Sequence, residues 1–149
     1  MNFKVQNFIT QDQINQLIYY SNNDTEVLKF THDSKRFRNI NSFNKWFNNH
    51  IEIYVLTNNT NNLLGIIWIK LKENDLSKFK HTFAIRIYKP LRGRGYSYKF
   101  AKEVFKKLNV KGLWLSANKD NFAGLKLYKK LNFKQIGNEG SQLIMELDL

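Results

Sequence analysis

The stretch Arg92-Gly93-Arg94-Gly95-Tyr96-Ser97 lies between two segments whose apolar patterns differ. Before it, residues 81–88 alternate, with Phe83, Ile85 and Ile87 on one face, which predicts a strand that ends ahead of Pro90. After it, residues 97–108 carry apolar side chains at helical spacing. The stretch is therefore predicted to be a glycine-rich turn that leads from a strand into an amphipathic helix.

A turn of this kind is suited to hold phosphate groups. Its two glycines permit positive φ angles, so successive N–H groups can point into one concavity at the positive end of the helix dipole. Arg92 and Arg94 can add charge-assisted hydrogen bonds, and the Ser97 hydroxyl supplies another donor. The turn is not a Walker loop, which ends in Gly-Lys-Ser/Thr, nor a dinucleotide fingerprint, which needs glycine at Tyr98. An ordinary turn with two solvated arginines is the alternative interpretation.

Strands and helices follow one another along the rest of the chain without a linker or an internal repeat. Thr10 to Gln13 has the form of a capping box, which predicts the start of a helix. Further helices are expected around residues 43–47 and at 122–131. Strands are expected at residues 3–8, 51–56, 63–71, 113–116, 133–136 and 143–147. This order predicts an α+β, or mixed α/β, fold in a single domain that covers residues 1–149.

The composition excludes several kinds of site. With 149 residues and 42% apolar content the chain can form a hydrophobic core, but it contains no cysteine. A disulfide framework, a thiolate zinc site and a cysteine nucleophile are therefore excluded, and His32, His50 and His81 show no ligand spacing, so no metal is expected. No apolar stretch approaches the ~20 residues that span a bilayer, and the first residues lack a signal-peptide pattern. A cytoplasmic protein with no membrane partner is expected.

The net charge of +12 is concentrated in one third of the chain. Residues 86–134 contain 14 lysines and arginines against only Glu103 and Asp120, whereas the remaining residues contain 10 basic and 10 acidic side chains. This imbalance predicts that the segment meets an anionic partner, although a solvated basic surface would have the same composition.

A second pattern follows the glycine-rich turn. It consists of Asn121-Phe122-Ala123-Gly124, then Leu127-Tyr128, then Asn132-Phe133. Together the two patterns resemble the GNAT superfamily of N-acetyltransferases, whose pyrophosphate loop reads Arg/Gln-x-x-Gly-x-Gly/Ala and whose later signature reads Asn-x-x-Ala, Leu-Tyr and Gly-Phe. Ser97, Gly124 and Asn132 depart from the usual residues, and asparagine can replace glycine at a left-handed helix end. The resemblance covers residues 82–133 well.

The resemblance implies a GNAT-like fold, with a central mixed, mostly antiparallel sheet that is flanked by helices and whose fourth and fifth strands splay apart. It implies acetyl-CoA as co-substrate, with the pyrophosphate on residues 92–97 and the pantetheine arm between the splayed strands. Ile87, Tyr88 and Lys89 would offer backbone hydrogen bonds to that arm. Asn121 would contact the arm or orient its backbone, unless it only caps its helix.

The implied reaction is the transfer of an acetyl group from acetyl-CoA to a primary amine. An alkylammonium group with a pKa of ~10.4 must lose a proton before it attacks, and the departing thiolate must gain one. Tyr128 is the candidate general acid, unless it is only a core aromatic. Many relatives carry a glutamate on the fourth strand, but residues 82–88 contain no acid. Glu73, Asp75 and His81 are alternatives for the base, and none is assigned.

The sequence leaves open the identity of the acceptor and two alternative functions. The acceptor is a small molecule, a peptide or a protein, and the basic segment favours an acidic peptide or protein. An acyl-CoA-binding protein without catalysis and a basic nucleic-acid-binding module are the alternative functions, of which the second is possible but does not account for both motifs. The oligomeric state does not follow from the sequence.

Overall fold

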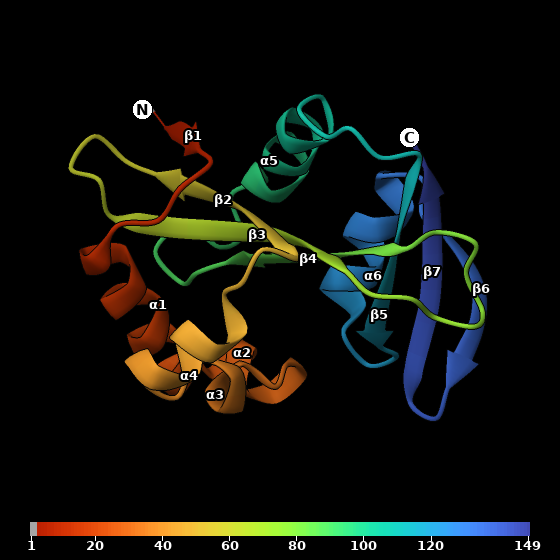
Figure 1. Cartoon of the computed structure of the whole chain (residues 1–149), viewed down its shortest axis with the longest axis horizontal. Coiled ribbons are helices and arrows are strands. Elements are labelled where there is room, and N and C mark those ends of the chain that lie inside the picture. The colour runs from red at the N-terminus through yellow and green to blue at the C-terminus, as the bar shows by residue number, and fades with distance from the viewer. Residues whose placement is uncertain (1–2) are drawn as a thin grey trace.

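A seven-stranded sheet runs through the molecule in the order β1-β2-β3-β4-β5-β7-β6 (Figure 1). The computed structural model describes residues 3–149. Its strands are β1 (Lys4–Gln6), β2 (Ile51–Thr57), β3 (Leu63–Leu71), β4 (His81–Ile87), β5 (Gly112–Asn118), β6 (Lys134–Glu139) and β7 (Gln142–Asp148). Its helices are α1 (Gln11–Asn23), α2 (Thr25–Phe30), α3 (Asp33–Arg36), α4 (Ile40–Trp46), α5 (Tyr96–Phe105) and α6 (Phe122–Lys130). The predicted α+β fold is confirmed.

The fourth and fifth strands splay apart as the resemblance implies. Neighbouring strands are antiparallel except β4 and β5, which are parallel. β4 pairs with β3 along its whole length, but within the described residues its register with β5 consists of Thr82 opposite Trp114. Both residues lie near the N-terminal ends of their strands. The two strands therefore separate toward their C-terminal ends and leave an opening in the sheet.

The helices cover the two faces of the sheet. Helices α1 to α4 pack on one face against Ile66 and Trp68 of β3, while α5 and α6 pack on the other face against Phe83 and Ile85 of β4. β4 contributes to both cores because alternate side chains of a strand point to opposite faces, and Ala84 packs on the α1 to α4 side. Within residues 3–149, no helix is long and apolar enough to cross a membrane.

The beginning of α1 confirms the predicted capping box, since the Thr10 side chain accepts a hydrogen bond from the Gln13 N–H and the Gln13 side chain accepts one from the Thr10 N–H. Helices α2 and α3 were not predicted. Asp24 caps α2 by accepting hydrogen bonds from the N–H groups of Glu26 and Val27, at 3.1 and 3.5 Å. β5 is longer than the predicted strand because it pairs with β7 from Gly112 to Asn118.

Candidate active site

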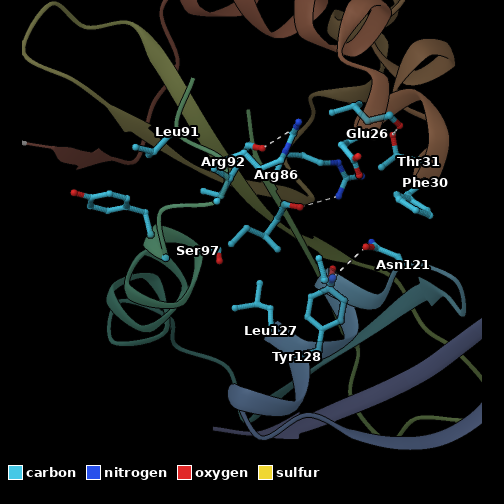
Figure 2. A pocket seen from close by; sticks show the side chains of 18 residues that line it. Glu26, Phe30, Thr31, Arg86, Leu91, Arg92, Ser97, Asn121, Leu127 and Tyr128 are labelled. Carbon is cyan, nitrogen blue, oxygen red and sulfur yellow. Dashed lines mark hydrogen bonds between the residues drawn. The ribbon is translucent and has the colours of Figure 1, made fainter. Parts of the chain in front are cut away.

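An open cavity of about 350 Å³ lies at the splay between β4 and β5 (Figure 2). Its walls come from both sides of the sheet, with α2 on one side and the glycine-rich turn, α5 and α6 on the other. The predicted site residues that line it are Ile87, Arg92, Gly93, Gly95, Tyr96, Ser97, Asn121 and Tyr128. Tyr88, Lys89 and Arg94 are not part of the lining.

The glycine-rich turn has the backbone geometry that its sequence predicts. Gly93 and Gly95 have φ angles of +82° and +78°, a region that glycine adopts at little cost. Within the described residues, the N–H groups of Gly93, Arg94 and Gly95 donate no hydrogen bond, and Gly95 caps α5 without a side-chain partner. The turn therefore presents successive unpaired N–H groups ahead of the positive end of a ten-residue helix, which is a favourable arrangement for an anion.

Arg92 makes contacts that its sequence position did not predict. Its Nη2 donates hydrogen bonds to Asp24 Oδ2 at 2.7 Å and to the Ile87 carbonyl at 3.0 Å. The Asp24 carboxylate is buried, and burial alone would raise its pKa. The hydrogen bond and positive charge of Arg92, together with hydrogen bonds from two N–H groups of α2, outweigh this effect and leave the pKa of Asp24 below its ordinary value. Arg92 thus ties the turn to the start of α2, while Arg94 is exposed to solvent.

The edge of β4 offers backbone groups to the opening. The Tyr88 N–H donates to the Leu64 carbonyl at 3.0 Å, across the ladder with β3. Because N–H groups along a strand point alternately toward its two neighbours, Ile85 and Ile87 direct theirs to the side from which β5 has diverged. Tyr88 has no backbone group left for a ligand, since its carbonyl accepts from the N–H groups of Leu91 and Arg92. The Lys89 N–H donates to Asp24 Oδ2 at 3.3 Å.

Asn121 and Tyr128 reach the cavity from α6. The Asn121 Oδ1 caps the helix by accepting from the Gly124 N–H at 3.1 Å, and its Nδ2 donates no hydrogen bond within residues 3–149. The Tyr128 ring packs edge to face on Phe133 at 6.0 Å, so it is part of the core. Tyr128 lines the cavity, and its hydroxyl forms no hydrogen bond among the described residues. Asn132 ends this segment with a φ of +74°, the left-handed conformation predicted for it.

The pKa of Tyr128 is raised by burial, which outweighs the opposing effect of the positive charge of Arg86. A tyrosine hydroxyl is protonated at neutral pH, and the rise in its pKa favours the same form. Among residues 3–149, the Tyr128 hydroxyl is therefore a hydrogen-bond donor without a partner at the wall of the cavity.

Arg86 stands on β4, and a buried carboxylate neutralises it. Its Nε and Nη2 donate to Asp33 Oδ2 and Oδ1 at 2.7 and 3.1 Å, and Arg36 donates to the same carboxylate. Burial alone would raise the pKa of Asp33, but Arg86 and Arg36 outweigh this effect and hold that pKa below its ordinary value. Asp33 is therefore an anchor for Arg86 and a poor proton acceptor.

The three alternatives that the sequence offered for the base, Glu73, Asp75 and His81, do not line the cavity. Glu73 lies 4.0 Å from Lys80 on the surface, and His81 begins β4 at the opposite end from the opening. Sequence reasoning also missed the lining residues of α2, which are Glu26, Val27 and Phe30, together with Thr31 after it. Asp24 as an N-cap, with Glu26 in the first turn, is the signal that could have found this helix.

Comparisons with known proteins agree with this geometry. The sequence profile described as Acetyltransferase (GNAT) family matches residues 16–133. No curated protein shows significant similarity.

Among solved structures, a chimera of the Vibrio cholerae spermidine N-acetyltransferase and hSSAT superimposes with a TM-score of 0.75 at 16% identity, covering 99% of this chain and 96% of the other. The spermidine N-acetyltransferase of Vibrio cholerae in complex with CoA and spermine gives 0.72 at 17% identity, covering 97% and 92%. The ribosomal-protein-S5-alanine acetyltransferase of Vibrio fischeri gives 0.71 at 12% identity, covering 99% and 93%.

At these identities the structural likeness shows the fold alone, whereas the profile match extends over most of the chain and includes both motifs. The sheet with its splayed fourth and fifth strands and the glycine-rich turn agree with that match. The chain therefore belongs to the GNAT family of acetyltransferases.

Proposed function

We propose that this chain transfers an acetyl group from acetyl-CoA to a primary amine. The observation that carries the proposal is that one cavity brings together the unpaired N–H groups of the turn, the diverging edge of β4 and the Tyr128 hydroxyl. A catalyst for this reaction needs an anion site for the cofactor, an edge along which its arm can lie and a donor near the leaving sulfur.

The residues present fit acetyl-CoA. The N–H groups of Gly93, Arg94 and Gly95 would bind the pyrophosphate, and the Ser97 hydroxyl would add a donor. The N–H groups of Ile85 and Ile87 would bind the pantetheine arm, and the Asn121 Nδ2 can donate to it while Oδ1 keeps its capping bond. Tyr88 is left out, because its backbone groups are used within the fold.

When bound, acetyl-CoA supplies the acetyl group as a thioester: the amine nitrogen bonds to the carbonyl carbon, the carbon–sulfur bond breaks and CoA leaves as a thiol. Tyr128 holds one proton at its hydroxyl oxygen, which it gives to the sulfur, and it regains a proton from the nitrogen that has formed the amide. The acceptor enters as an ammonium ion, so a further proton leaves to solvent before the bond forms.

The basic surface would affect how an acceptor reaches the protein and not the acetyl-transfer step itself. The lysines of α5 and α6, including Lys99, Lys102, Lys126 and Lys129, are exposed, form no salt bridge within the described residues and do not line the cavity. They could attract an acidic peptide or protein acceptor to the surface, as the sequence suggests. They do not set the charge where the amine reacts.

The test begins with Gly95→Asp, which introduces a negative charge into the proposed pyrophosphate site. Gly140→Asp is the matched control, because Gly140 also has a positive φ of +60° but lies in the turn between β6 and β7. A Cβ atom at either position meets no atom within 4 Å, so both variants have room to fold. Calorimetry should show that acetyl-CoA binds Gly95→Asp at least ~100-fold more weakly, equivalent to about 2.7 kcal/mol, while Gly140→Asp binds like the parent.

Equal affinity of the parent and a folded Gly95→Asp variant would overturn the assignment of the pyrophosphate site. Release of CoA is then measured with acetyl-CoA and a panel of amines, peptides and proteins. A parent protein that binds acetyl-CoA but releases no CoA with any acceptor would favour the non-catalytic alternative.

A further inference from the structure

The charged side chains that line the cavity are paired, with one exception. Arg86 is neutralised by Asp33, and Arg92 is neutralised by Asp24, each through a hydrogen bond of 2.7 Å. The side chain of Glu26 forms no salt bridge and no hydrogen bond within the described residues. Although the chain carries a net charge of +12, the unpaired charge in the wall of the cavity is therefore negative.

Glu26 lies on the side of the cavity opposite the wall proposed for acetyl-CoA. In Figure 2, Glu26, Phe30 and Thr31 lie on one side of Arg86, whereas Ser97 and Leu127 lie on the other. The glycine-rich turn, α5 and α6 form the wall proposed for acetyl-CoA. An acceptor that enters opposite this wall would lie along α2 and meet the Glu26 carboxylate there.

Next to this carboxylate the wall includes the ring of Phe30, over which Lys29 Nζ lies at 5.1 Å from the centroid. Glu26 and Phe30 are four residues apart in α2, so their side chains lie on one face of the helix, and both line the cavity. Buried Val27 lies between them. A ligand that fits this wall carries a positive charge for Glu26 and an apolar body for Phe30.

We propose that Glu26 is a specificity-determining residue that binds a cationic acceptor, and that the acceptor is a primary amine with an apolar body and no carboxylate beside the amine. This inference rests on the proposed acetyl transfer. It names the acceptor class of the cavity and differs from the acidic acceptor that the net charge alone suggests.

The test compares two acceptors that differ by one carboxylate, phenethylamine and phenylalanine, with acetyl-CoA at saturating concentration. The parent should have the higher kcat/KM for phenethylamine. Glu26→Gln should raise KM for phenethylamine about fivefold, the upper end for an ion pair at an exposed residue such as Glu26, and leave the Kd for acetyl-CoA unchanged. Glu26→Arg should reverse the preference toward phenylalanine. Glu103→Gln is the matched control, because it removes the same charge from an exposed site outside the cavity.

A second measurement does not depend on turnover. Calorimetry of phenethylamine with the CoA-loaded protein should show weaker binding to Glu26→Gln than to the parent or Glu103→Gln. Equal binding, an unchanged KM in Glu26→Gln, or a parent that prefers phenylalanine would overturn the role of Glu26. A parent that binds both CoA and phenethylamine but forms no amide would instead contradict the proposed acetyl transfer and leave the binding role of Glu26 supported.

Discussion

Replacing Asp33 by asparagine removes a carboxylate on which the cavity depends. Asp33 is fully buried, and it accepts two hydrogen bonds from Arg86, at 2.7 and 3.1 Å, and a third from Arg36. Loss of one partner of a buried ion pair typically costs 3–5 kcal/mol, because the other charge stays buried without compensation. Arg86 keeps its bond to the Ile85 carbonyl and its contact with the Trp68 ring, and 16% of its side chain is exposed. We therefore expect the lower end, about 3 kcal/mol.

Urea unfolding followed by tryptophan fluorescence measures this loss. Asp75→Asn is the matched control, since it removes the same charge from an exposed loop and should change stability by no more than about 0.5 kcal/mol. The double variant Asp33→Asn/Arg86→Met should recover part of the loss, because the uncompensated Arg86 charge is gone. A loss below about 1 kcal/mol in Asp33→Asn, or no recovery in the double variant, would refute the reasoning.

The pH dependence of the unfolding free energy tests the role of Asp33 independently. The pKa of Asp33 is lower in the folded protein than the ordinary value of about 3.9 expected after unfolding. A carboxylate of this kind contributes stability that is complete above the unfolded pKa and is lost as the pH falls through the folded pKa. The stability difference between the parent and Asp33→Asn should thus be constant from about pH 8 to pH 5 and should narrow only below about pH 4. A difference that narrows near neutral pH would mean that another group titrates.

Two further predictions concern the cavity. Tyr128→Phe should slow acetyl transfer in single-turnover experiments by about 100-fold while the Kd for acetyl-CoA stays unchanged, since only the proton donor is lost; an unchanged rate with chemistry limiting would make Tyr128 a core aromatic alone. Gly65→Ala should lower the unfolding free energy by about 1–3 kcal/mol and weaken acetyl-CoA binding, because its Cβ would lie 2.9 Å from both the Arg86 carbonyl oxygen and Ile87 Cδ1. Urea unfolding and calorimetry measure both effects, and a fully stable variant would show that β4 moves aside freely.

The local structure on the side of the cavity proposed for acetyl-CoA could be predicted from the sequence because its determinants are local. The positive φ angles of Gly93 and Gly95 depend on neighbouring residues, and the helix that follows is evident from its own apolar spacing. The Asn121 cap and the position of Tyr128 on α6 are likewise set within a few residues. Each of these features can be recognised from the few residues that surround it in the sequence.

The structure on the side proposed for the acceptor could not be predicted in the same way. Helix α3 has only four residues, and its buried Asp33 bonds to Arg86, 53 positions away in the chain. Asp24 bonds to Arg92, 68 positions away. In a linear sequence these residues resemble solvated charges, because only the packed sheet brings each acid to its arginine. The same packing leaves Glu26 unpaired, because Asp33 already neutralises Arg86 and Asp24 already neutralises Arg92.

The pairing of Arg92 with Asp24 also decides which substitution tests the proposed phosphate site most sharply. Both hydrogen bonds of Arg92 come from Nη2, so its Nε and Nη1 donors remain available to a phosphate. Its charge, however, is already compensated by a buried carboxylate, which weakens the attraction that it can add. The N–H groups of Gly93, Arg94 and Gly95 have no such partner within the described residues. Anion binding should therefore depend more on the backbone of the turn than on its arginines, and Gly95→Asp should lower the affinity for acetyl-CoA far more than Arg92→Ala does.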